Sequence, residues 1–67
     1  MKPSKEPLGE DDVIIEFHRV GAAVKVTAME PRTLTEVSIV GPATASEADL
    51  TQLVLRKLEY VLAKKRG

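Results

Sequence analysis

The fold is decided by the stretch VIIEFHRVGAAVKVTAME, which occupies residues 13–30. On both sides of Gly21, β-branched and aromatic side chains alternate with polar ones. Alternation of this kind is typical of strands with one buried face, so the stretch predicts two antiparallel strands, near residues 12–19 and 23–30. The side chains expected to face the core here are Val13, Ile15, Phe17, Val24 and Val26.

The alignment of these two strands depends on the turn between them. A two-residue turn at residues 20–21 pairs Phe17 with Val24 and the acid Glu16 with the base Lys25, and such cross-strand pairs stabilise a sheet. Tight hairpin turns need Gly first or positive φ at both positions. A valine suits neither requirement, so a slightly longer, bulged turn is the alternative. Phe17 is the only phenylalanine and there is no tryptophan, so we expect it to be the largest apolar side chain in the core.

A third strand is predicted at TEVSIV, residues 35–40, with Val37 and Ile39 facing inward. A four-residue loop at residues 31–34 would place Ala28 across from Val37. Loops of that length are usually built on a type I turn, for which the proline at the first position is well suited. The last loop position often takes a positive φ, to which a leucine is poorly suited.

A helix near residues 46–65 completes the predicted domain. Ser46 is a good N-cap, and Asp49 three residues later makes a pair like a capping box. The apolar positions span more of the helix circumference than one three-stranded sheet should cover. A central stripe of Leu50, Leu53, Val54, Leu58 and Val61 suits the sheet, whereas Leu55 and Leu62 lie at its far margin.

The expected fold class is therefore α+β. It is a three-stranded antiparallel meander with one C-terminal α-helix packed on one face, forming a single β-β-β-α domain over residues 12–66. Residues 1–11 are rich in Pro, Gly, Lys and Glu and predict a disordered leader. They contain no apolar stretch of the kind found in a secretory signal. No run approaches the roughly 18–20 apolar residues of a membrane span. We therefore expect a cytoplasmic protein without a membrane partner.

No catalytic, cofactor or metal constellation can be found in the 67 residues. The chain has no cysteine and a single histidine, which excludes disulfides, thiolate metal sites and a His-rich metal site. The glycines are scattered and form no phosphate-binding loop. His18 lies two residues from Glu16, but a surface histidine on a strand is the simpler interpretation. The sequence thus predicts a protein that is not an enzyme and carries no cofactor.

Four stretches carry a resemblance to a known family: EFHRVG at residues 16–21, VKV at 24–26, EVSIVGPA at 36–43 and LRKLEYVL at 55–62. From about residue 16 to residue 64 the chain resembles a family of short, uncharacterised alphaproteobacterial proteins classed as a domain of unknown function. The resemblance implies no activity, and no functional residue is transferred from it. Similar sequences tend to carry Gly in place of Leu34, which implies a strained second turn.

The leading functional hypothesis is a small binding or assembly module that self-associates, most simply as a two-fold dimer. A domain of this size lacks disulfides and a metal, so burial between subunits would add stability. Two alternative interfaces are predicted. One is the edge of the first strand, where Val13, Ile14 and Ile15 place apolar side chains on both faces; the other is the helix margin at Leu55 and Leu62.

Nucleic-acid binding is the weaker alternative. Residues 56–67 hold five basic residues and one acid, a net charge of +4, and such asymmetry can signal a partner. The exposed sheet face offers no aromatic side chain, and its charges nearly cancel. Cations also gather at a helix C-terminus because the backbone dipole is negative there. The candidate contacts of this alternative are Arg19, Lys25, Lys64, Lys65 and Arg66.

Overall fold

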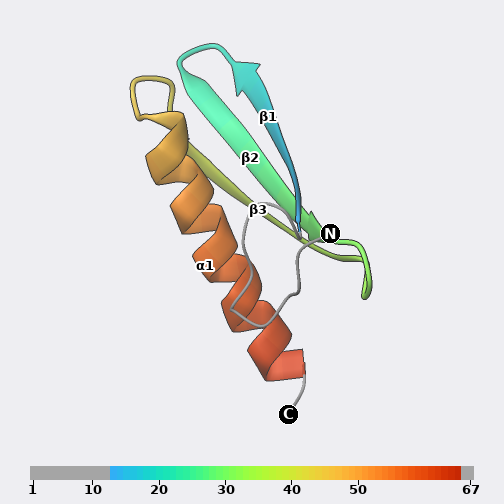
Figure 1. The fold of residues 1–67 in the computed structure, drawn as a ribbon. Coiled ribbons are helices and arrows are strands. Elements are labelled where there is room, and N and C mark those ends of the chain that lie inside the picture. Colours follow the sequence, from blue (N-terminus) through green and yellow to red (C-terminus); the bar gives the residue numbers. More distant parts are fainter. Residues whose placement is uncertain (1–12, 66–67) are drawn as a thin grey trace.

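A computed structural model of the chain describes residues 13–65. It contains β1 (Ile14–Val20), β2 (Ala23–Glu30), β3 (Thr35–Pro42) and α1 (Glu47–Lys65). The strands form one antiparallel sheet in the order β1-β2-β3, and α1 packs on one face of it (Figure 1). The predicted α+β class and meander topology are confirmed. The predicted leader at residues 1–11, together with Asp12 and Arg66, lies outside the described residues.

The β1–β2 hairpin differs from the sequence-based alignment by two residues. The turn occupies residues 21–22, so that Phe17 pairs with Val26 and Glu16 pairs with Thr27. Gly21 takes the first corner of this turn with φ 61°, a conformation that glycine adopts without steric cost and that favours a type II′ hairpin turn. The predicted turn would have placed a valine at that corner. A shift of two residues keeps every side chain on its predicted face of the sheet.

The β2–β3 hairpin has the predicted alignment. Ala28 pairs with Val37, and Val26 pairs with Ile39. Leu34 closes the four-residue loop with φ 58°, which is the positive φ expected at that position. Leucine adopts such a conformation at a steric cost, because its Cβ approaches the following carbonyl oxygen. The second turn is therefore strained, as the resemblance implied.

The helix begins where its capping residues predict. The backbone N–H of Asp49 donates to the hydroxyl of Ser46 at 3.1 Å, which satisfies one of the free N–H groups of the first turn. The backbone N–H of Leu50 donates to the carbonyl of the same serine at 3.1 Å. Glu47 and Asp49 in the first turn and Lys64 and Lys65 in the last complement the helix dipole.

The core lies between α1 and the inner faces of β2 and β3, because the helix packs mainly on these two strands (Figure 1). The buried apolar side chains are Val13, Val26, Ala28, Val37, Leu50, Val54 and Leu58. Two sequence-based expectations were wrong. Phe17 is 38 % exposed, and Leu53 is 52 % exposed although it was placed in the central helix stripe. A helix about 10 Å wide covers about two strands spaced 4.8 Å apart, so the inner face of β1 is only partly covered.

Candidate interaction surface along the first strand

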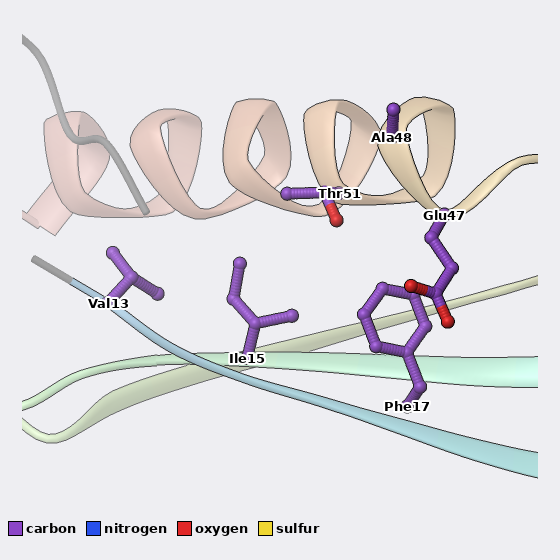
Figure 2. A pocket seen from close by; sticks show the side chains of 6 residues that line it. All are labelled: Val13, Ile15, Phe17, Glu47, Ala48 and Thr51. Carbon is purple, nitrogen blue, oxygen red and sulfur yellow. The ribbon is translucent and has the colours of Figure 1, made fainter. Parts of the chain in front are cut away.

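An open groove runs between β1 and the first half of α1. Its volume is about 470 Å³, and we refer to it as the β1 groove; it is lined by Val13, Ile15, Phe17, Glu47, Ala48 and Thr51. Figure 2 shows that the side chains of Val13, just before β1, and of Ile15 and Phe17 in β1 extend toward the helix. The groove exists because the helix sits over the other two strands. Its lining combines the apolar side chains of the sheet with the polar side chains of Glu47 and Thr51 on the helix.

Strand β1 exposes large apolar side chains on both of its faces. Phe17 is 38 % exposed on the inner face, while Ile14 is 49 % and Val20 is 61 % exposed on the outer face. Of the predicted interface residues, Val13 is buried and Ile15 is half-buried in the β1 groove, whereas Ile14 lies on the opposite face. The sequence assigned Phe17 to the core and so missed it as a surface residue. The signal that could have identified it is the width of the sheet compared with that of a single helix.

The backbone of β1 has a free hydrogen-bonding side, which we call the β1 edge. The N–H of Ala43 donates to the carbonyl of Ala22 at 2.8 Å, so even-numbered residues of β2 bond to β3 and odd-numbered ones bond to β1. In β1 the even-numbered residues therefore face β2. The N–H and C=O groups of Ile15, Phe17 and Arg19 point the other way, where the described part of the chain provides no neighbouring strand.

The outer edge of β3 is different, because a helix side chain covers part of it. Ser38 occupies an edge-facing position in β3, and Lys57 donates from its ammonium group to the Ser38 carbonyl at 2.8 Å. Lysine side chains placed on edge strands hinder pairing with another chain. Pro42 at the end of β3 has no N–H to offer. The β1 edge is thus the more accessible of the two.

The predicted helix margin does not form a separate apolar surface. Leu55 and Leu62 are both half-buried and pack against the core. The exposed apolar side chains of α1 are instead Leu53 and Tyr60, which is 63 % exposed. The Lys64 ammonium lies 5.4 Å from the centre of the Tyr60 ring, a cation–π distance. Of the two surfaces predicted from sequence, the helix margin is thus partly covered at both of its residues in the described part of the chain, whereas the strand surface includes an exposed isoleucine.

The residues proposed for nucleic-acid contact fall into two groups at opposite ends of the domain. Arg19 lies at the β1–β2 turn, where its Nε donates to the Gly21 carbonyl at 3.2 Å. Lys25 lies near that turn on the outer face, across from His18. At the other end, the Lys65 ammonium donates to the Thr35 hydroxyl at 3.2 Å. Lys64 lies over Tyr60, and Arg66 is outside the described residues. No common basic surface is formed by the described members of the set.

A buried polar cluster closes the β2–β3 turn. The Glu30 carboxylate accepts hydrogen bonds from the Thr33 hydroxyl at 2.7 Å and from the backbone N–H groups of Thr33 at 2.9 Å and Arg32 at 3.1 Å. The Thr35 hydroxyl joins the Thr33 hydroxyl at 2.7 Å. These bonds, the Thr33 hydroxyl foremost, hold the pKa of Glu30 below its ordinary value, although burial acts in the opposite direction. The cluster fixes the loop that holds Leu34 at positive φ.

The described residues offer little for chemistry. His18 faces Lys25 across the hairpin, rather than Ala23 as the predicted alignment required. Within residues 13–65, no three His, Asp or Glu side chains are grouped as metal ligands would be. The one described helix is not apolar enough to cross a membrane. What the arrangement can do is offer a strand edge and an adjoining groove of mixed apolar and polar lining to another polypeptide.

Over residues 13–65 these features define a small β-β-β-α module whose β1 edge is the more accessible of its two sheet edges. The family model described as a domain of unknown function (DUF6898) matches residues 10–65, and the chain belongs to this family. The resemblance to a domain of unknown function is thereby confirmed. No curated protein and no solved structure matches the chain at a significant level.

Proposed function

We propose that this chain is a non-enzymatic assembly module that binds another polypeptide by strand addition at the β1 edge, with a second copy of itself as the simplest partner. The observation that carries the proposal is the coincidence of three features on one strand. Within residues 13–65, β1 has edge-facing N–H and C=O groups without a neighbouring strand, exposed apolar side chains on both faces, and the β1 groove beside it. Main-chain hydrogen bonds provide affinity in strand addition, and side-chain pockets provide specificity.

Association through this surface would bury exposed apolar side chains. Fully burying a large apolar side chain contributes about 1.5–3 kcal/mol, and Ile14, Phe17 and Val20 are each at least one-third exposed in the single chain. A two-fold dimer contains two copies of each of these side chains, and both copies would be covered. This gain must exceed the loss of translational and rotational freedom, which is about 4–15 kcal/mol. A weak to moderate dimer is the expected result.

Nucleic-acid binding has less support from the geometry. Basic residues that bind a phosphate backbone usually gather in one patch or stripe. Here Arg19 and Lys25 lie at the turn between the first two strands, whereas Lys64 and Lys65 lie at the far end of the helix (Figure 1). Arg19 and Lys65 also make hydrogen bonds within the chain.

Sedimentation velocity at tens to hundreds of micromolar tests the proposal, using two variants matched for exposure. Ile14→Lys places a charge on β1 at a side chain that is 49 % exposed, and Leu53→Lys does the same on α1 at one that is 52 % exposed. We expect the unmodified chain and Leu53→Lys to form dimers and Ile14→Lys to remain monomeric. A monomeric unmodified chain over this range would contradict self-association. Dissociation caused by Leu53→Lys alone would transfer the interface to the helix.

A further inference from the structure

We infer that two copies of the chain pair antiparallel through β1 in a register centred on Phe17, so that Glu16 of each copy faces His18 of the second copy. The inference rests on the proposed self-association and specifies its geometry. The register follows from the direction of the backbone N–H and C=O groups of β1 and from the order of its side chains. The strand is short, so few registers are available and each can be examined.

Backbone N–H and C=O groups point to opposite sides of β1 at alternate residues, and this alternation restricts which residues of two copies can face each other. Only odd-numbered residues of β1 direct their N–H and C=O groups toward the free edge. An antiparallel partner must therefore oppose odd residues with odd residues and even with even. Under two-fold symmetry the centre of the pairing falls on a residue of β1. The candidates near the middle of the strand are Glu16, Phe17 and His18.

The register centred on Phe17 pairs the whole of β1, residues 14–20, with itself. It places Ile14 against Val20 of the second copy and Glu16 against His18 of the second copy, each occurring twice. The two Phe17 side chains meet at the axis. Every large apolar side chain that β1 exposes, namely Ile14, Phe17 and Val20, thereby gains an apolar neighbour directly opposite. Such pairs stabilise neighbouring strands.

The neighbouring registers pair fewer residues, and the one centred on Glu16 also opposes like charges. A centre at Glu16 sets this carboxylate against its own copy, and like charges directly opposite destabilise a sheet. It also pairs only residues 14–18 of the strand. A centre at His18 sets the two imidazoles against each other and pairs only residues 16–20. In both cases the Ile14–Val20 contact is lost, and one of these side chains stays exposed at each end.

The register also joins the two β1 grooves. Directly opposed residues of paired strands lie on the same face of the sheet, so both helices would cover the same face of one six-stranded sheet. The inner side chains Ile15 and Phe17 of the two copies would then lie side by side between the helices. This placement covers the partly exposed Phe17. The single chain leaves that side chain exposed because α1 packs mainly on β2 and β3.

Isotope-filtered NMR on an equimolar mixture of labelled and unlabelled chains tests the register directly. Within one copy, Ile14 and Val20 lie at opposite ends of β1, about 20 Å apart at roughly 3.3 Å per residue, which is too far for a nuclear Overhauser effect. We expect an intermolecular effect between the Ile14 and Val20 methyl groups. Intermolecular contacts between other pairs of β1 residues would refute this register and leave the proposed function standing, whereas intermolecular contacts confined to α1 would refute both. A monomeric chain would refute both.

A charge exchange provides an independent test. In His18→Glu, the new carboxylate of each copy would face Glu16 of the second copy, which gives two pairs of like charges. We expect the dimer dissociation constant to rise about tenfold. Adding Glu16→Lys places opposite charges at both positions and should return the constant to near its original value. Within one copy the introduced glutamate would face Lys25, so the fold should be retained, and backbone chemical shifts check this. Failure of the double variant to recover association would contradict the pairing of residues 16 and 18.

Discussion

Truncation of Leu58 and of Phe17 should have effects in the reverse order of side-chain size. Leu58 is 0 % exposed, and replacing a fully buried leucine with alanine costs about 3–5 kcal/mol because a cavity remains. Phe17 is 38 % exposed. Full burial of a large apolar side chain contributes about 1.5–3 kcal/mol, so the buried part of Phe17 contributes about 1–2 kcal/mol. The β1 groove is open to solvent, so Phe17→Ala leaves little enclosed space and no large cavity cost is added.

Urea denaturation followed by circular dichroism measures both changes. The measurement is made at two protein concentrations, because Phe17 also lies in the proposed interface and association would add to its apparent effect. The lower concentration reports on the single copy. Small domains have a total stability of about 5 kcal/mol at the lower end of the usual range, so Leu58→Ala should remove most of the transition. Equal costs for the two variants at the lower concentration would show that the inner face of β1 is covered as well as the rest of the core.

Three further predictions concern the turn, the acid and the basic residues. Leu34→Asn should stabilise the fold by about 0.5–1 kcal/mol, because asparagine accepts positive φ more readily and the leucine is 71 % exposed; a lower melting temperature would contradict this. Folding lowers the pKa of Glu30, so the hydrogen bonds of its carboxylate stabilise the fold at pH values above the ordinary pKa of 4.5. This stabilisation is lost as the pH falls through the folded-state pKa. The urea concentration at the unfolding midpoint should therefore decrease more between neutral pH and pH ~3 for the unmodified chain than for Glu30→Gln. Equal decreases in the two proteins would contradict this role of Glu30. Generic DNA and RNA should not bind at physiological salt, and binding that weakens steeply with salt would instead support a nucleic-acid function.

The sequence predicted the β2–β3 hairpin better than the β1–β2 hairpin for a physical reason. A shift of two residues leaves every side chain on the same face, so the apolar pattern cannot distinguish the predicted alignment from the observed one. Only the chemistry of the turn can. Gly21 at the first corner decides the β1–β2 case, whereas the predicted turn began at Val20. In the second hairpin the loop length and the apolar pairing agreed, and Ala28 opposes Val37 as expected.

The candidate surface was predicted only in part, because it depends on where the helix lies across the sheet. Periodicity identifies the apolar face of a strand but not which strands a helix covers. Phe17 was therefore assigned to the core, and Leu55 and Leu62 to a free margin. To choose an edge residue for mutation, one must also know which backbone N–H groups of β1 point toward β2 and which point toward the free edge. Ile14 bonds toward β2, so proline there would disrupt the domain itself, while proline at an odd-numbered position would remove only an edge-facing N–H.

The contact between Lys57 and the Ser38 carbonyl has a consequence for how many copies can assemble. A sheet with two equally free edges can add chains at both ends and grow into an open fibre, whereas a sheet with one free edge is complete when that edge is paired. In the proposed dimer, the contact of Lys57 with Ser38 would hinder the addition of a further strand at the outer edge of β3. Removing the lysine ammonium group, as in Lys57→Met, should convert a finite pair into larger and less soluble species whose size increases with concentration.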